Sequence, residues 1–415
     1  MTDEHRRLRD QVHEFAREEI APRVARMERA GTHAERDLAA LMGTLGWIGV
    51  LVPREYGGMG AGHVAKTILI EHTAYVSGAA GAILQASLIP ALALQYLGTP
   101  EQQDEWLPQI ADGLWSTIAV TEPEHGSDVL GMTSSARRNQ DGSWVLNGHK
   151  TFIGNSDIAG LHLVIARTGE VGSTERASAV EPDRSRGRRS LSAFLVEADR
   201  RGVCVEPQPF TGLHGFSAGD LRLREVHVPA ANLLGGEEGT GLVAAYGASV
   251  VCGRLNLAAL ALGLHQRLRD ETVAFVTKRP RKGGYLSDKP VVRRRLAEIE
   301  SALMNSELAI YHSSALLDSG VPCDPALINA KLTAKRAAAL AAQEAADLFG
   351  GYAVRADYPF ARLDRDIRHV AAPAGPDDVQ LLRLGEEAAG VPREIQWSLL
   401  FTGDPKTARE VALSA

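Results

Sequence analysis

The chain has 415 residues, of which 45% are hydrophobic and 23% charged, and its formal net charge is −6. This composition is that of a soluble globular protein, and it excludes a disordered chain, a collagen-like fibre and a small disulfide scaffold. A mildly acidic chain is a poor general ligand for nucleic acids, so we predict no nucleic-acid partner. At roughly 100–200 residues per domain, the length indicates two to four domains.

Three cysteines, odd in number and far apart, indicate a reducing compartment and argue against a structural metal site. The charged N-terminus, residues 1–19, lacks the apolar core of a signal peptide, so we expect a cytoplasmic protein. One uncharged stretch, Ala74 to Gly98, is long enough to span a bilayer. Because it consists largely of Ala and Gly and is interrupted by Ser77 and Pro90, we expect buried helices there and no membrane span.

The first third of the chain has the apolar spacing of helices. Apolar residues recur at this spacing from Leu8 to Ile20 and again from Leu38 to Trp47. After a turn-rich break at Val52 to Gly60, two apolar helices are predicted over about 64–96. The sequence Thr99-Pro100-Glu101 combines a cap residue, a proline and an acid, which predicts the start of another helix.

Near Ser116 the pattern changes to short strands, which are predicted at 117–121, 134–138, 144–147, 161–167, 191–196, 203–207 and 221–228. Strands at this spacing without intervening helices indicate a barrel or sandwich. The polar segment 169–189 is predicted to be a mobile insertion. Alternatively, its arginines at 184, 186, 188 and 189 contact an acidic carrier protein or a phosphate.

Beyond Gly241 the pattern is helical again, at 243–276, 291–317 and 326–348, and a shorter pair runs to about residue 390. We therefore predict an α+β fold that is mostly α. An N-terminal helical domain spans 1–115, a central β-barrel or sandwich domain spans 116–235, and a C-terminal four-helix-bundle domain spans 236–395. A C-terminal tail follows at 396–415.

Several sequence motifs occur in one order along nearly the whole chain. The segment from Thr121 to Asp128 reads TEPEHGSD, and Asn147 to Asn155 reads NGHKTFIGN. They are followed by Val228-Pro229, Leu233-Leu234-Gly235, Arg279 with Gly283, Phe349-Gly350-Gly351 and Arg365-Asp366. In sequence and order these motifs resemble the acyl-CoA dehydrogenase family.

The resemblance implies FAD as cofactor and α,β-dehydrogenation of an acyl thioester as activity. It implies that the loop from Thr121 to Ser127 lines the flavin and its diphosphate, and that Phe152 stacks on the flavin ring. The residues implied to bind the cofactor are Thr121, Ser127, Phe152, Ile153, Gly154, Arg279, Asp347, Gly350 and Gly351. Those implied to bind substrate are Ser127, Arg254 and Gly375. Arg279 is implied to serve the FAD of a neighbouring subunit, which makes the protein an oligomer.

Considered one at a time, each of these residues can also be explained by an ordinary structural role that involves no cofactor. Thr121 and Ser127 are common turn residues, and Phe152 alone is more typical of a core. The glycine pair at 350–351 alone is a helix stop. Arg279 lies in a basic run that is typical of a solvated loop. Only their common order favours the cofactor site.

The usual catalytic base is missing. The resemblance places the family's glutamate at Ala374 or, in other members, at Gly253, and neither side chain can accept a proton. His125, Asp377 and Asp378 are candidate substitutes, with His125 preferred, and Glu124 and His369 are further ones. The usual cofactor positions have also changed to Gly154 and Asp347. An aspartate about 6 Å from a phosphate would cost on the order of 3 kcal/mol unless it is compensated.

Three hypotheses follow. The first is an FAD-dependent dehydrogenase of a CoA- or carrier-protein-bound acyl group, with a relocated base and a role in secondary metabolism. The second is a flavin oxidase or monooxygenase on the same fold. The third is a non-catalytic subunit that completes the FAD site of a related chain. The expected partners are an acyl-CoA or acyl-carrier-protein substrate and an electron-transfer flavoprotein, in a homotetramer or a heteromer with a related subunit.

Overall fold

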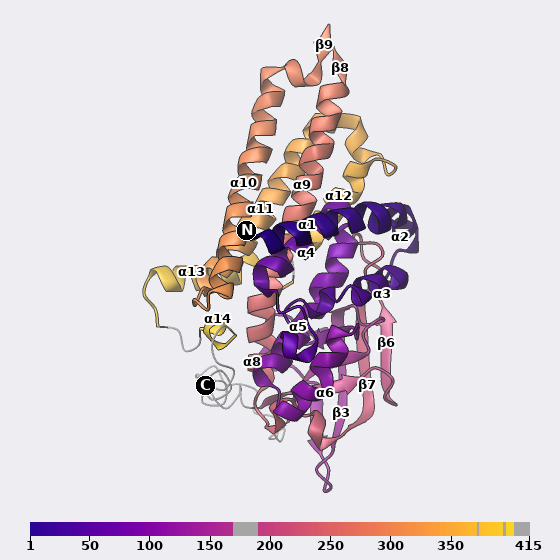
Figure 1. Ribbon diagram of the computed structural model, residues 1–415, viewed down its shortest axis with the longest axis vertical. Coiled ribbons are helices and arrows are strands. Elements are labelled where there is room, and N and C mark those ends of the chain that lie inside the picture. The colour runs from indigo at the N-terminus through magenta and orange to yellow at the C-terminus, as the bar shows by residue number, and fades with distance from the viewer. Residues whose placement is uncertain (169–189, 372, 393–395, 402–415) are drawn as a thin grey trace.

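The computed structural model describes residues 1–168, 190–371, 373–392 and 396–401. Helices at the N-terminus, a central sheet and long C-terminal helices follow one another along the chain (Figure 1). This is the predicted α+β fold, which is mostly α. The predicted insertion at 169–189 lies outside the described residues. The domain limits after residues 115, 235 and 395 stay predictions.

The N-terminal helices are α1 (Asp3–Phe15), α2 (Val24–Ala30), α3 (Arg36–Thr44), α4 (Gly62–Val76), α5 (Gly78–Leu97) and α6 (Pro100–Ala111). Helix α6 begins where the sequence predicts it. The Thr99 hydroxyl accepts a hydrogen bond from the Gln102 N–H at 3.3 Å, and the Gln102 side chain accepts one from the Thr99 N–H at 3.1 Å. This reciprocal pair satisfies two N–H groups that an uncapped helix leaves free.

The uncharged stretch from Ala74 to Gly98 forms the end of α4 and all of α5, with Ser77 between them. By length and composition alone, α5 and the continuous helical segment 241–278 are apolar enough to cross a membrane. In the folded chain, however, 78% and 94% of their most apolar windows are buried inside the protein. Both segments are therefore helices of the protein core, which is the prediction made for the stretch from Ala74 to Gly98.

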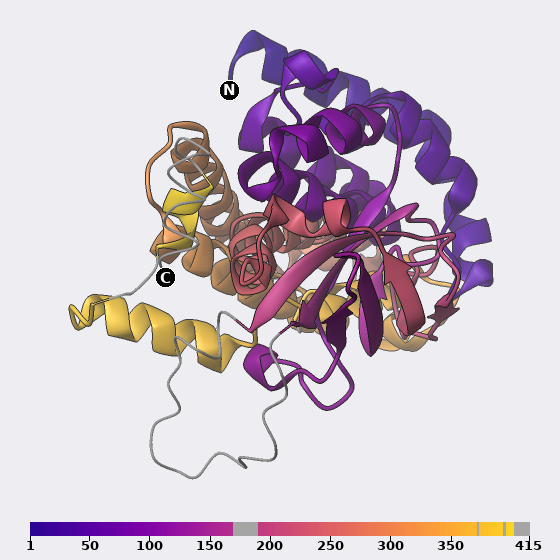
Figure 2. The same ribbon diagram turned by 90° about the horizontal axis from the view of Figure 1, so that it is seen from below.

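The central sheet has seven strands: β1 (Ser116–Ala119), β2 (Ser135–Arg138), β3 (Trp144–Gly154), β4 (Leu161–Arg167), β5 (Leu191–Glu197), β6 (Val203–Pro207) and β7 (Ala218–Val228). Their order is β1-β4-β2-β3-β7-β6, and β5 pairs with β4. The predicted hairpin of β2 and β3 is present. The sheet curls beneath the N-terminal helices, as Figure 2 shows.

Three predicted strand limits are wrong by two residues or more, since the last strand also begins at Ala218 instead of residue 221. The first strand ends at Ala119 instead of residue 121, because the Thr121 carbonyl leaves the β1–β4 pairing and accepts a hydrogen bond from the Thr151 N–H at 2.9 Å. Strand β3 continues to Gly154 because β7 pairs with it as far as Ala218. This extension carries Phe152 and Gly154 to the edge of the helical layer.

The C-terminal part contains α8 (Gly241–Ala248), α9 (Arg254–Lys278), α10 (Pro290–Asp318), α11 (Asp324–Phe349), α12 (Pro359–His369), α13 (Asp377–Ala388) and α14 (Trp397–Leu400). A short hairpin of β8 (Pro280–Arg281) and β9 (Gly284–Tyr285) joins α9 to α10. The predicted tail therefore begins with a helix, and its residues beyond 401 lie outside the described part. Helices α9, α10 and α11 pack on one another, and α9 and α10 also pack on α4.

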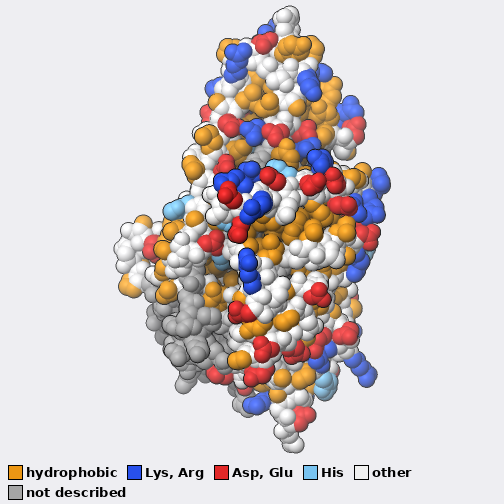
Figure 3. Space-filling model, viewed as in Figure 1, with side chains coloured by type: hydrophobic (Ala, Val, Ile, Leu, Met, Phe, Trp, Pro, Cys, Tyr) orange, Lys and Arg blue, Asp and Glu red, His pale blue; other side chains and the backbone are white. Residues whose placement is uncertain are grey.

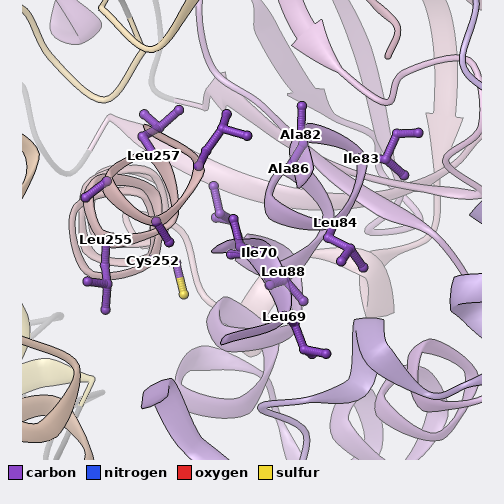
Figure 4. Close-up of a cluster of buried hydrophobic side chains, with 14 of the residues drawn as sticks. Leu69, Ile70, Ala82, Ile83, Leu84, Ala86, Leu88, Cys252, Leu255 and Leu257 are labelled. Carbon is purple, nitrogen blue, oxygen red and sulfur yellow. The ribbon is translucent and has the colours of Figure 1, made fainter. Parts of the chain in front are cut away.

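Helices α8 and α9 are one continuous helical segment with a π-helical turn at Ser249–Gly253. Such wider turns are rare and are frequently found at functional sites. Their apolar residues pack against α5, and Figure 4 shows Cys252 on the side of the helix that faces Ile70 of α4 and Leu88 of α5. The core thus fixes the π-helical turn against α5.

Candidate active site

The two positions implied for a catalytic base lie directly opposite one another. A Cβ atom added at Gly253 would lie 3.5 Å from the Cβ of Ala374, although the residues are far apart in sequence. The same added atom would lie 4.0 Å from Cδ1 of Ile89 on α5. Ala374 has a φ of 56°, in the left-handed region that non-glycine residues rarely adopt. The two positions implied for the glutamate base are therefore adjacent in this fold, but neither of them carries a carboxylate.

The position implied to contact the flavin lies next to this point. A Cβ added at Gly154 would lie 3.2 Å from the Cβ of Ala86 and 2.8 Å from the ring of Phe216. Ala86 and Ile89 are three residues apart on α5, so their side chains are neighbours on one helix face. Helix α5 therefore brings Gly154 and Gly253 together. The Phe216 ring fills the space that a larger residue at 154 would need.

Phe152 is exposed beside Gly154. Its side chain is 67% exposed and its φ is 58°, an unfavourable conformation for a large residue. Its ring lies 6.1 Å from the ring of Phe210, which in turn lies 5.3 Å from the ring of His369. Ile153 points the other way and is buried in the sheet core. The exposed aromatic face is suited to stacking on a flat cofactor.

The loop from Thr121 to Ser127 is held by a buried ion pair. Lys150 Nζ lies 2.9 Å from Glu122 Oε1 and also donates to the Val120 carbonyl at 3.0 Å. The Glu122 carboxylate accepts further hydrogen bonds from the backbone of Thr133 and Ser134. Burial alone raises the pKa of Glu122, but these hydrogen bonds and the Lys150 charge lower it to about 2. The loop is therefore fixed by a charged carboxylate.

Two of the three implied substrate residues, Arg254 and Gly375, adjoin the same point, and the third, Ser127, is bound to α8. The Ser127 carbonyl accepts a hydrogen bond from the Tyr246 hydroxyl on α8 at 3.4 Å. Arg254, the residue after Gly253, is buried. The Gly375 carbonyl follows Ala374 and accepts a hydrogen bond from Lys331 Nζ at 2.8 Å. Tyr246 and Lys331 were not predicted from the sequence, because nothing local indicates that their helices face this loop.

Lys331 anchors the loop that carries Ala374. Its Nζ donates to the carbonyls of both Pro373 and Gly375, the two neighbours of Ala374. The side chain is buried, and burial, together with the positive charge of Arg254, lowers the pKa of Lys331 to about 7. The only sequence signal was a lysine inside an apolar helical stretch, 327–334.

This pKa predicts a pH-dependent stability. The pKa of Lys331 falls from 10.5 to about 7 on folding, so between these values the unfolded chain binds a proton that the folded chain has released. The free energy of unfolding attributable to Lys331 therefore rises with pH in this window. We expect the thermal midpoint of wild type, minus that of Lys331→Met, to increase between about pH 7 and pH 10. A difference that stays constant would contradict the assignment.

A second group of predicted residues lies at the other end of α9. Arg279 follows α9 directly and precedes the hairpin at the top of Figure 1. At 1.5 Å per residue, α9 places it roughly 38 Å from Gly253. Its guanidinium lies 4.9 Å from the centre of the Tyr352 ring and donates to that hydroxyl at 3.2 Å. The backbone at Gly350 and Gly351 is open, with no atom near either added Cβ.

Asp347 lies near the start of this second group, and its charge is compensated. Arg295 Nη1 lies 2.8 Å from Asp347 Oδ2 and 2.6 Å from Glu344 Oε2. The sequence could not identify this partner, because Arg295 is on α10 and Asp347 on α11. The unfavourable charge expected beside a phosphate is therefore reduced by a neighbouring helix.

The predicted substitute bases differ in their partners and in their exposure to solvent. His125 Nδ1 lies 3.8 Å from the Asp128 carboxylate. Asp377 Oδ1 lies 2.7 Å from Lys335 Nζ, and Arg336 is also near, so this carboxylate faces α11. Asp378 and Glu124 are exposed. His369 contacts Phe210 as described, and burial and then His214 lower its pKa, which keeps the imidazole neutral at pH 7.

These residues fit a cofactor with a flat ring system and an anionic tail. Phe152 offers an exposed aromatic face, and a Cβ at Gly126 in the adjoining loop would meet no atom, so a ligand can approach that backbone closely. Arg279 and the open glycine backbone supply a cation and a close approach at the second group. In the described part of the chain, no group of three or more His, Cys, Asp or Glu side chains is arranged to hold a metal ion.

Three family models match the chain in succession. They are the acyl-CoA dehydrogenase N-terminal domain over residues 2–114, the middle domain over 117–226 and the C-terminal domain over 239–389. An acyl-CoA dehydrogenase of Bacillus subtilis is 32% identical over 393 residues, which cover 94% of this chain and 99% of that protein. A 3-(aryl)acrylate reductase of Clostridium sporogenes is 30% identical over 383 residues, covering 91% and 97%.

The fold agrees with these matches. The structure of butyryl-CoA dehydrogenase from Megasphaera elsdenii superposes with a TM-score of 0.85 at 26% identity, covering 94% of this chain and 99% of that one. The family is FAD-dependent, which confirms the cofactor prediction. The individual site residues stay predictions. By the match of all three domains and the identity to full-length relatives, the chain belongs to the acyl-CoA dehydrogenase family of flavoprotein oxidoreductases.

Proposed function

We propose that this protein oxidises an acyl thioester between its α and β carbons with FAD as the hydride acceptor. The observation that carries the proposal is the meeting of Gly154, Gly253 and Ala374 around one face of α5. This arrangement brings the flavin position next to the point where the family holds the α carbon. FAD supplies hydride acceptance when it is bound, and the residues of the chain bind, orient and deprotonate the substrate.

The proton acceptor is the part of this function in which the chain departs from its family. Asp377 is engaged with Lys335, and His125 faces Asp128. His369, in contrast, is neutral at pH 7 and packs on Phe210 beside the predicted flavin wall. A neutral imidazole can accept a proton near neutral pH. We therefore favour His369 over His125 as the substitute base.

We further propose that the protein works as an oligomer. Arg279 lies roughly 38 Å along α9 from Gly253, too far for the two residues to belong to one compact site in the same chain. A second copy, or a related subunit, would bring the two groups together. Large hydrophobic side chains are exposed on this half of the molecule, at Val291, Met304, Leu308 and Val354. Figure 3 shows hydrophobic side chains at its surface there.

We place the oligomer in the cytoplasm.

The electron acceptor and the acyl carrier belong to the same proposal. An electron-transfer flavoprotein is the acceptor that the family resemblance implies, and the acyl group is carried by CoA or by a carrier protein in secondary metabolism. A second candidate function is that of a subunit without its own chemistry. One observation favours it. Both base positions lack a carboxylate, whereas Arg279, which is implied to bind the FAD of a neighbouring subunit, is present and in contact with Tyr352.

The test is to purify the chain alone and to measure its flavin-to-protein ratio and its visible spectrum. The FAD-loaded protein is then mixed anaerobically with a panel of acyl-CoA thioesters. A ratio near one with bleaching of the flavin absorbance would support the dehydrogenase. A flavin-free protein that gains FAD only with a related subunit would establish the second candidate. Bound FAD that no thioester reduces, but that consumes dioxygen when reduced chemically, would point to an oxidase.

The Arg279 group gives a direct prediction. We expect Arg279→Ala to lower the affinity for FAD by on the order of tenfold, because a charge-assisted hydrogen bond to a phosphate is lost. Arg281→Ala is the matched control, since Arg281 is exposed on the adjoining strand β8. The measurement is the FAD retained after dialysis, together with the oligomeric state. Equal retention in both variants would remove Arg279 from the cofactor site.

A further inference from the structure

A lysine is buried in the helical core without an acidic partner. Lys66 lies on α4, and its side chain is completely buried. The Asp318 carboxylate, at the start of α4, accepts hydrogen bonds from the N–H groups of His63 and Val64 and forms no ion pair with Lys66. A buried ammonium without an ionic partner is costly, and burial therefore lowers the pKa of Lys66. The fold thus favours the neutral amine at this position.

The Lys66 amine lies between an imidazole and a thiol. Its Nζ lies 3.0 Å from Nδ1 of His63 and 3.9 Å from Sγ of Cys252, which is also completely buried. Cys252 belongs to the π-helical turn, and Figure 4 shows it facing Ile70, one turn along α4 from Lys66. Burial raises the pKa of the Cys252 thiol, while the neighbouring Lys66 lowers it. A thiol that can pass its proton to an adjacent amine becomes a nucleophile, unlike a thiol surrounded only by apolar groups.

This pair is connected to the protein surface. His63, which contacts Lys66, lines an open surface pocket together with Asp318. A small polar molecule can therefore reach the imidazole, and the amine and the thiol lie directly behind it. The other two thiols have no such arrangement, since no lysine in the described part of the chain is hydrogen-bonded to Cys204 or Cys323.

We infer that Lys66 and Cys252 form a covalent modification site, at which hydrogen peroxide joins Nζ to Sγ through a sulfur–nitrogen bond. The inference does not depend on the proposed function, because neither residue is assigned to the flavin or to the thioester. Cys252 directly precedes Gly253, so the bond ties α4 to the turn that carries the predicted reaction point.

The reaction consumes one molecule of hydrogen peroxide. In the first step Sγ attacks a peroxide oxygen, the O–O bond breaks, and the departing hydroxide receives the thiol proton through Nζ and leaves as water. Cys252 is thereby oxidised to a sulfenic acid, and the peroxide is reduced. In the second step the lone pair of Nζ attacks Sγ, the S–O bond breaks, and the hydroxide takes a proton from the amine and leaves as a second water. The product is a sulfenamide, a bond that sulfenic acids also form with backbone nitrogen.

The test treats the purified full-length protein with hydrogen peroxide and analyses its peptides by mass spectrometry without a reductant. In wild type we expect the peptides that carry Lys66 and Cys252 to be joined, with a mass lower than their sum by two hydrogen atoms. Dithiothreitol should separate them, because a thiol displaces the nitrogen from sulfur. Lys66→Met keeps a long side chain without the amine and should leave Cys252 unlinked. Cys323→Ser is the matched control, since it removes the other buried thiol and should leave the link unchanged.

The exposed Cys204 shows whether the peroxide has acted. Unlinked Lys66 and Cys252 in a folded wild-type protein whose Cys204 is fully oxidised would overturn the inference. Lys66→Arg is measured in parallel, because a guanidinium stays protonated and cannot attack sulfur, so it should also be unlinked. We expect peroxide to raise the thermal midpoint of wild type by about 3 °C or more, because a bond between residues distant in sequence constrains the unfolded chain, and not to raise that of Lys66→Met. None of these measurements requires turnover of a thioester.

Discussion

In a His369→Ala background, Gly253→Glu is expected to accelerate anaerobic reduction of the bound flavin by butyryl-CoA by roughly 100-fold, because a positioned general base contributes about 10²–10⁴ in rate. The substitution is sterically possible. An added Cβ would meet only ordinary contacts, at 3.5 Å from Ala374 and 4.0 Å from Ile89. Lys331, which donates to the carbonyl of Gly375 next to Ala374, supplies a cation on this side of the site.

Gly253→Gln is the matched control for this prediction. It has nearly the same size and helix propensity but no basic carboxylate, so in the same background its flavin should be reduced no faster than in His369→Ala alone. The flavin-to-protein ratio is measured for both variants, since a change in FAD content would otherwise mimic a change in rate. Equal rates for the glutamate and glutamine variants would show that the Gly253–Ala374 point is not where the α proton lies.

Lys150→Met is expected to lower the free energy of unfolding by about 3–5 kcal/mol, because it leaves the buried Glu122 carboxylate without its ionic partner. The loop from Thr121 to Ser127 depends on this pair, so we also expect loss of bound FAD. The measurements are denaturant unfolding followed by circular dichroism and the flavin-to-protein ratio after purification.

The double variant Lys150→Met/Glu122→Gln tests whether the unpaired charge of Glu122 causes the loss of stability. It removes the buried charge but keeps an amide oxygen to accept from the N–H groups of Thr133 and Ser134. It should therefore recover at least about half of the lost stability. Lys278→Met, at the exposed end of α9, controls for the loss of any lysine. A single Lys150→Met variant as stable as wild type would mean that Glu122 is protonated or solvated in the folded chain.

Local patterns were sufficient for most of the architecture. The cap at Thr99 predicts α6, and the strand limits 161–167 and 203–207 are those observed. These signals depend on residues close in sequence, such as a hydroxyl three residues before an N–H or side chains that alternate along one strand. The ordered motifs from Thr121 to Asp366 predicted the family and its cofactor, and the absence of a carboxylate at both base positions follows from the sequence alone.

What the sequence by itself determined is therefore the fold class, the family and the residues implied for the site. Only the tertiary structure decided how these residues meet. The contact of Gly253 with Ala374 depends on the packing of α9 against the loop before α13, and the compensation of Asp347 depends on Arg295 from another helix. Lys331 is marked locally only as a lysine in an apolar helical stretch, and its role arises from a segment that is distant in sequence and meets it only when the core closes.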